Sequence, residues 1–212
     1  MPSALDLRLD AAYELITGPG GPIQVGSIEK DGRSLPFITN APTNLGDYVA
    51  FFCAQHGDAT FLVEGDERLS FKQVYAAARK VAAGLIETHG VARGDRVGLA
   101  MRNANAWCVS YLGILLAGGC ATLLNGWWQG GELAAGIEDA EAKLVIADPQ
   151  RAARLAEPGV AHSAKVVTLD ITRPIDEAIA PVSGSADTVL PALTGDDLAT
   201  ILFTSGSTGQ SK

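Results

Sequence analysis

The hydrophobic pattern of the chain is most regular between residues 70 and 90, where apolar side chains recur with the period of an α-helix. Ser70 is suited to cap this helix, Gln73 completes a capping box, and Gly90 is placed to end it. The expected buried stripe comprises positions 71, 74, 75, 78, 81, 82, 85 and 86. The pattern therefore predicts one amphipathic helix packed against a core.

Short apolar runs alternate with further helical patterns along the rest of the chain. The predicted strands cover residues 96–101, 121–124, 143–147, 165–169 and 198–203, and the predicted helices among them cover 106–116, 132–140 and 150–155. This alternation predicts an α/β fold in which a mainly parallel sheet is covered by helices on both faces. Because the last strand is almost wholly apolar, we expect it to lie in the interior of the sheet.

The first 42 residues lack this alternation of helical and strand patterns. It contains the run Gly18-Pro19-Gly20-Gly21-Pro22, which cannot continue a helix or a strand. A helix over 43–55 and a hairpin that turns at Gly65-Asp66 come next. We therefore expect an irregular N-terminal lead-in over residues 1–42 and an α/β subdomain over residues 43–212, with a long connection over 171–196.

Charge and cysteine content narrow the function classes. The net charge is −8 and no cluster of Lys or Arg is present, so we expect no nucleic-acid partner. Cys53, Cys108 and Cys120 lie in apolar stretches whose spacing fits neither a zinc site nor a redox pair. They are interpreted as small buried hydrophobic residues in a reducing compartment, which predicts a cytoplasmic protein. We expect no signal peptide, because the N-terminus carries Asp6, Arg8 and Asp10 and lacks a long apolar core.

One uncharged stretch is long enough to cross a membrane. Residues 103–131 contain no charged side chain. Gly118-Gly119 interrupts the stretch, and Asn125-Gly126 marks a turn. A buried helix followed by a buried strand therefore explains it better than a transmembrane segment.

The residues with the clearest chemistry come directly after the last predicted strand. Open α/β sheets bind ligands at the carboxyl ends of their strands. Glycines let backbone N–H groups approach an anion, and hydroxyls and a lysine add further donors. The predicted phosphate-binding residues are Thr204, Ser205, Gly206, Ser207, Thr208, Gly209 and Lys212.

This segment is not a Walker loop, because Ser211 stands where that motif requires its second glycine. The alternative is a Ser/Gly-rich surface turn or linker at a chain end. The buried apolar strand that precedes Thr204 counts against this alternative.

Residues 201–212 resemble the AMP-binding signature of the adenylate-forming superfamily, although Ser211 replaces the commoner proline. This superfamily includes acyl-CoA synthetases, the adenylation domains of nonribosomal peptide synthetases and beetle luciferases. Further segments resemble the family in the same order, namely residues 69–74, 82–85, 94–103, 111–118 and 142–148. The resemblance thus extends from about residue 43 to the end of the chain.

The resemblance implies a two-step reaction. A carboxylate attacks the α-phosphate of ATP to give an acyl adenylate, and a thiol, usually of CoA, then displaces AMP. Residues 204–209 would hold the β- and γ-phosphates, Lys212 would close the loop, and Mg²⁺ would arrive with ATP. No catalytic residue and no dedicated metal site is assigned in this chain, since His56, His89 and His162 are isolated in the sequence.

Two features of the sequence bear on the identity of the acid substrate. The segment Asn125-Gly126-Trp127-Trp128 and the long lead-in resemble bacterial fatty-acyl-CoA synthetases more than peptide-synthetase domains. The alternative is that both tryptophans simply pack a turn. The resemblance also implies that the acyl pocket, the adenine site and a C-terminal lysine lie beyond residue 212, so the chain would be the N-terminal fragment of an acid:CoA ligase and inactive alone.

Two other functions stay open. The acceptor could be a carrier protein in place of CoA, or the chain could be a binding module that keeps the fold without the chemistry. The reading frame after Lys212 would separate both ligase hypotheses from the binding module.

Overall fold

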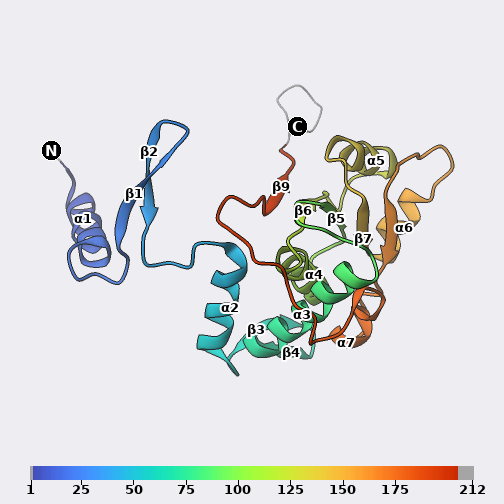
Figure 1. The fold of residues 1–212 in the computed structure, drawn as a ribbon, viewed down its shortest axis with the longest axis horizontal. Helices are drawn as coiled ribbons and strands as arrows, with labels where there is room; N and C mark the ends of the chain where they lie inside the picture. The colour runs from blue at the N-terminus through green and yellow to red at the C-terminus, as the bar shows by residue number, and fades with distance from the viewer. Residues whose placement is uncertain (1, 205–212) are drawn as a thin grey trace. The chain divides into compact units, whose positions relative to one another are not determined.

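The computed structural model describes residues 2–204, and the chain divides after Pro42 into two units. The first unit contains helix α1 (Ala4–Thr17) and an antiparallel hairpin of β1 (Val25–Lys30) and β2 (Arg33–Ile38) (Figure 1). The expectation of an irregular lead-in over residues 1–42 is therefore wrong.

Local signals explain the order in this first unit. The Ser3 hydroxyl accepts a hydrogen bond from the Asp6 amide, and the Asp6 carboxylate accepts one from the Ser3 amide, which together form a capping box. Asp31 and Gly32 have φ values of 50° and 71°, as a type I′ hairpin turn requires. No residue of α1 is buried, so these caps and turns, and not a core, define the elements.

The second unit begins with the predicted helix and hairpin. These are α2 (Leu45–His56), β3 (Thr60–Glu64) and β4 (Glu67–Ser70), followed by α3 (Phe71–Glu87). The capping box at the start of α3 is confirmed: the Gln73 amide donates to Ser70 Oγ at 3.3 Å, and the Ser70 amide donates to Gln73 Oε1 at 2.8 Å. The predicted apolar stripe is confirmed as well, with Val74, Ala78, Val81, Ala82 and Leu85 buried.

The main sheet of the described residues has five parallel strands in the order β8-β7-β5-β6-β9. The strands are β5 (Arg96–Ala100), β6 (Cys120–Leu123), β7 (Leu144–Ala147), β8 (Lys165–Thr168) and β9 (Thr200–Leu202). The connecting helices are α4 (Asn105–Leu116), α5 (Gly130–Asp139) and α6 (Pro149–Leu155). The predicted parallel α/β architecture is thus confirmed.

Helices cover both faces of this sheet, as the alternation of side chains along β7 demonstrates. Leu144 and Ile146 pack into one hydrophobic cluster with α3 and α4, whereas Val145 and Ala147 pack into a second cluster with α5 and α6. The uncharged stretch 103–131 contains α4 and β6, both largely buried, in agreement with the expected helix and strand. Within residues 2–204, no helix is long and apolar enough to cross a membrane.

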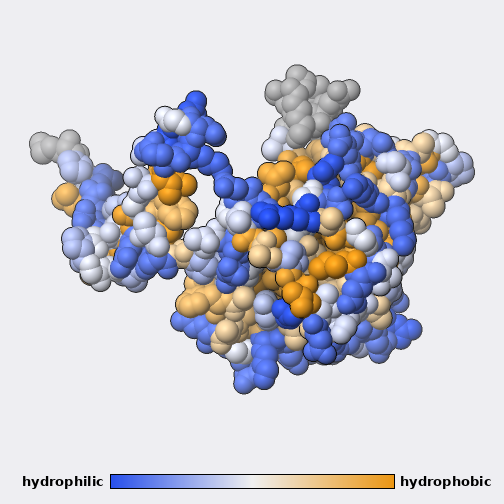
Figure 2. Space-filling model, in the orientation of Figure 1, coloured by the Kyte–Doolittle hydropathy of each residue, from blue (hydrophilic) through white to orange (hydrophobic). Residues whose placement is uncertain are grey.

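The position of β9 differs from the prediction. Within the described part of the chain, β9 pairs only with β6 and forms an edge of the sheet. Leu198 is 68% exposed and Leu202 is 67% exposed. Figure 2 shows the resulting apolar surface at the end of β9. An apolar run is necessary for an interior strand, but the strands on either side decide the position.

The long connection before β9 is partly ordered. It contains α7 (Ile175–Ala178) and the 3₁₀ helix η1 (Ala180–Val182), and it lies against α3. The Gly184 amide donates to the carbonyl of Lys80 at 2.8 Å. A side chain at Gly84 would come within 2.2 Å of the Val182 carbonyl oxygen, so this glycine allows the connection to approach the helix.

Candidate functional site at the carboxyl edge of the sheet

The predicted phosphate-binding segment begins at the carboxyl end of β9. Because all the main strands are parallel, this end lies at the same edge as the carboxyl ends of β5, β6 and β7. Thr204 is exposed at this edge. The other predicted site residues lie outside the described part of the chain, namely Ser205, Gly206, Ser207, Thr208, Gly209 and Lys212.

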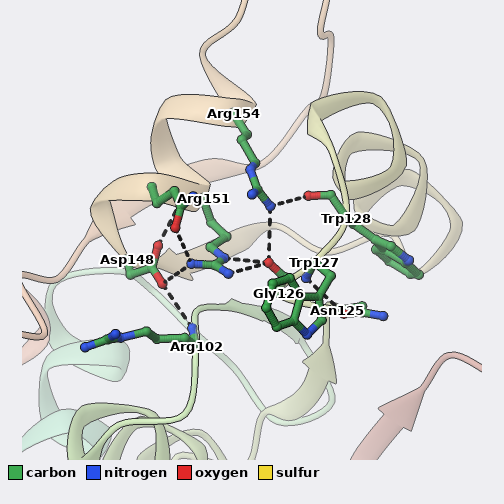
Figure 3. Close-up of polar contacts among 9 residues, drawn as sticks. Arg102, Asn125, Gly126, Trp127, Trp128, Asp148, Arg151 and Arg154 are labelled. Atoms are coloured by element: carbon green, nitrogen blue, oxygen red, sulfur yellow. Dashed lines mark hydrogen bonds and ion pairs between the residues drawn. The ribbon is translucent and has the colours of Figure 1, made fainter.

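A buried ion pair lies just after the end of β7, and its aspartate also bonds the backbone just after β5 (Figure 3). Asp148 follows β7 and is 2% exposed, and Arg151 on α6 is 6% exposed. Asp148 Oδ2 accepts from Arg151 Nη1 at 3.1 Å and from the Arg102 amide, just after β5, at 3.0 Å. Asp148 Oδ1 caps α6 by accepting from the Arg151 amide at 2.9 Å. Loss of one partner from such a pair costs about 3–5 kcal/mol, because the other charge stays buried.

The same arginine reaches the loop that follows β6. Arg151 Nε donates to the Gly126 carbonyl at 2.7 Å. Arg154 Nη1 donates to the Gly126 carbonyl at 3.2 Å and to the Trp128 carbonyl at 2.7 Å. We call Asp148, Arg151 and Arg154 the α6 clamp. The α6 clamp therefore fixes the backbone of residues 126–128 relative to the ends of β5 and β7.

The two tryptophans of this loop have different environments. Trp127 is 84% exposed and Trp128 is 9% exposed, and their rings point in different directions (Figure 3). Trp128 packs against Gly136 of α5, where an added Cβ would lie 2.8 Å from the indole. The interpretation that both tryptophans pack a turn therefore holds for Trp128 and is wrong for Trp127.

Trp128 also contacts the residue before Thr204. Its ring and that of Phe203 are 5.2 Å apart between centroids and inclined at 66°, an edge-to-face arrangement. At the other end of β9, Tyr111 Oη and Thr200 Oγ1 are hydrogen-bonded at 2.9 Å. Side-chain contacts with α4 and with the loop after β6 therefore restrain β9 at both of its ends.

An ion pair fixes the segment that leads into β9. Arg93 Nη2 donates to Asp197 Oδ2 at 2.8 Å, and the Thr194 amide donates to the same oxygen at 2.6 Å. The hydrogen bond from Arg93 is the main cause that holds the pKa of Asp197 below its ordinary value. The same contact raises the pKa of Arg93.

The described residues offer no group of three or more His, Cys, Asp or Glu side chains that could hold a metal ion. His56 packs between Phe52 and Phe71, with ring centroids 6.2 and 4.8 Å away. His89 lies near Lys165 and the Pro181 carbonyl. Cys53 and Cys120 are buried, Cys108 is half-buried, and all three are free thiols. Burial is the leading cause that raises the pKa of each thiol, which makes these cysteines poor nucleophiles.

Sequence reasoning missed the α6 clamp. The predicted strand over 143–147 and helix over 150–155 leave Asp148-Pro149 without a role, although an aspartate before a proline is a helix N-cap signal. The partner that both arginines share is the backbone carbonyl of Gly126, which no side-chain pattern reveals.

Comparison with known proteins assigns the family. The family model described as AMP-binding enzyme matches residues 49–212. The chain belongs to the AMP-binding enzyme family. The resemblance of residues 201–212 to the AMP-binding signature is thereby confirmed.

Family members of different kinds are similar to this chain. FadD6 of Mycobacterium tuberculosis (strain ATCC 25618 / H37Rv), a medium/long-chain-fatty-acid–CoA ligase, is 31% identical over 174 residues, which are 80% of this chain and 28% of the ligase. The FR901469 synthetase of Dothideomycetidae sp. (strain 11243) is 34% identical over 156 residues, which are 73% of this chain and 1% of the synthetase.

A solved family structure supports the same fold. The inhibitor-bound N-terminal domain of FACL13 from Mycobacterium tuberculosis superposes with a TM-score of 0.69 at 25% identity, over 81% of this chain and 43% of that domain. The chain therefore spans less than half the length of each of these three relatives.

Proposed function

We propose that this chain provides the N-terminal part of an enzyme that activates a carboxylic acid with ATP, and that Thr204, residues 205–209 and Lys212 hold the β- and γ-phosphates. One observation carries the proposal: the predicted phosphate-binding residues begin at Thr204, just after β9 ends, at the edge of a parallel sheet where such folds bind ligands. Mg²⁺ would enter with ATP and offset the charge of the phosphates.

The proposed chemistry has two steps. A carboxylate oxygen attacks the α-phosphorus, the bond to the β-phosphate oxygen breaks, and pyrophosphate leaves. A thiolate then attacks the acyl carbonyl, and AMP leaves. The phosphate loop acts in the first step alone, because the β- and γ-phosphates depart with pyrophosphate.

We further propose that the acid is a fatty acid and that CoA is the acceptor thiol. The similarity to FadD6 over 80% of this chain supports this choice. The three free cysteines support a reducing, cytoplasmic location as part of the same proposal. The similarity to the FR901469 synthetase favours a second candidate, in which the acyl group passes to a carrier protein.

The test uses the complete protein encoded by the reading frame that contains this chain. ATP–pyrophosphate exchange is measured over carboxylic acids of different chain length, amino acids included, and thioester formation is then measured with CoA and with a phosphopantetheinylated carrier protein. Exchange with fatty acids and transfer to CoA would support the ligase. Exchange with an amino acid and transfer to the carrier would support the second candidate. Absence of exchange with every acid would favour a non-catalytic binding module.

A further inference from the structure

We propose that Trp128 is a positioning residue for the adenylation step, because its indole holds Phe203 and thereby sets the place of Thr204, where the predicted phosphate loop begins. This inference rests on the proposed function, since it assigns a role within the same site. It concerns a residue outside the signature, separated from Thr204 by 76 positions in the sequence.

The Trp128 ring is well placed for this role. It is 9% exposed and meets the Phe203 ring edge to face, at a centroid distance of 5.2 Å. Its backbone is fixed by Arg154, which donates to the Trp128 carbonyl at 2.7 Å. Gly136 of α5 leaves room for the indole, because an added Cβ there would lie 2.8 Å from its ring.

Strand β9 needs such a support. It spans only Thr200–Leu202 and, among the described residues, pairs with β6 alone. Leu202 is 67% exposed, so little packing restrains the end of the strand. The hydrogen bond between Tyr111 and Thr200 restrains the start of β9, whereas the contact with Trp128 is made by the residue that directly precedes Thr204.

Phosphate contacts are sensitive to small displacements. Backbone donors stabilise a transition state only when they are held in place before the reaction, and a misplacement of about 1 Å can cost about a hundredfold in rate. The α6 clamp is built on a buried ion pair between Asp148 and Arg151. The α6 clamp holds the backbone of Trp128 relative to the ends of β5 and β7, and the Trp128 ring contacts Phe203 just after β9. Trp128 therefore restrains the position of the end of β9.

The neighbouring Trp127 provides a matched control. It belongs to the same loop and has the same side chain, but it is 84% exposed. Phe203 provides the complementary variant, because it is the residue through which Trp128 is proposed to act and is only half-buried.

The experiment compares Trp128→Leu, Trp128→Phe, Phe203→Leu, Trp127→Leu and the Trp128→Leu/Phe203→Leu double variant in the complete protein. ATP binding is measured without acid, and adenylation and thioester formation from a supplied acyl adenylate are timed separately. Trp128→Leu and Phe203→Leu should each weaken ATP binding and slow adenylation by about three- to tenfold, as expected for one aromatic pair. Thioester formation should stay unchanged.

The remaining variants sharpen the result. Trp128→Phe keeps an aromatic edge and should recover most of the loss, and Trp127→Leu should have no effect. The double variant should bind ATP and form the adenylate no more poorly than either single variant, because the two single substitutions remove the same contact. If Trp128→Leu does not fold, Phe203→Leu and Trp128→Phe decide the matter.

Three outcomes would overturn the inference: equal losses in both half-reactions, additive losses in the double variant, or an equal loss from Trp127→Leu. Wild-type protein without acid-dependent exchange would instead overturn the proposed function. The role of Trp128 is then judged on ATP binding alone, and ATP binding that Trp128→Leu leaves unchanged would contradict it.

Discussion

The centre of the sheet and its β9 edge are built from similar sequences but have different surroundings. Val97 and Leu99 of β5 and Val145 and Ile146 of β7 are fully buried, whereas Leu202 of β9 is 67% exposed. Helices cover both faces of the central strands. Strand β9 has a described neighbour on one side alone and carries the start of the family signature.

This difference separates the residues that stabilise the fold from those that we propose bind the ligand. Complete burial of one aliphatic side chain contributes about 1.5–3 kcal/mol relative to exposure, so the central strands supply much of the stability. Open sheet edges and loops at strand ends contribute less to stability, and binding residues are concentrated there. Substitutions in the central strands should therefore lower the free energy of unfolding, and substitutions after β9 should slow the adenylation reaction.

The largest expected effect is a complete loss of enzymatic activity. The 212-residue chain alone should show no acid-dependent ATP–pyrophosphate exchange, because it spans less than half the length of its relatives and leaves β9 exposed at the sheet edge. The complete protein, assayed over the same acids, is the control. Exchange by the 212-residue chain clearly above a blank without enzyme would contradict this prediction.

The next largest effect is a loss in the adenylation half-reaction alone. Gly206→Val in the complete protein should slow adenylation by about a hundredfold or more, or ~3–4 kcal/mol, because a side chain would displace backbone donors from the phosphates. Thioester formation from a supplied acyl adenylate should stay close to normal.

Gly131→Val is a matched control for this variant, because a Cβ at Gly131 would have no atom within 4 Å. It should leave both half-reactions unchanged. Parallel losses in both half-reactions by a folded Gly206→Val protein would count against the role of residues 204–209 in phosphate binding.

A pair of leucine variants compares the two regions of the sheet directly. Leu99→Ala should lower the free energy of unfolding by about 2–5 kcal/mol, because it leaves a cavity in the core. Leu202→Ala should change it by about 0.5 kcal/mol or less, as is usual for exposed positions. Urea unfolding of the chain gives both values, and similar losses from the two variants would contradict the comparison.

The smallest effect concerns pH and the segment before β9. The hydrogen bond from Arg93 lowers the pKa of Asp197, so the stabilisation is complete above the ordinary aspartate pKa of 3.8 and is lost as pH falls through the lower folded pKa. Asp197→Asn should therefore melt at a lower temperature than the wild type at pH 7 and pH 5. The difference should shrink below about pH 4, and a difference that stays constant down to pH 2 would contradict this assignment.

Much of the second unit could be predicted from the sequence, because its signals are local. Ser70 and Gln73 cap α3 as expected, and the predicted main-sheet strands match the observed ones to within a few residues. The first unit was predicted wrongly, although Ser3 with Asp6 and Asp31 with Gly32 are also local signals. The glycine- and proline-rich run 18–22 suggested irregular structure throughout, whereas it only links α1 to β1.

The candidate site also has one part that could be predicted from the sequence and one part that could not. The family signature over residues 201–212 could be identified from the sequence, because its glycines, hydroxyls and lysine are close together in the chain, as the proposed phosphate site requires. The contacts that support it could not. Arg151 donates to the backbone carbonyl of Gly126, 25 positions away, and the aromatic pair of Trp128 and Phe203 joins the loop after β6 to the end of β9.

The sequence by itself determined the family, the alternation of helices and strands, and the location of the signature, because periodicity, caps and glycines act within a few residues of one another. Only the tertiary structure decided that β9 lies at an edge of the described sheet and that Trp128 is buried while Trp127 is exposed. The physical reason is that hydrophobicity gives each side chain the same preference for burial, but the elements that pack around it decide which side chains are covered.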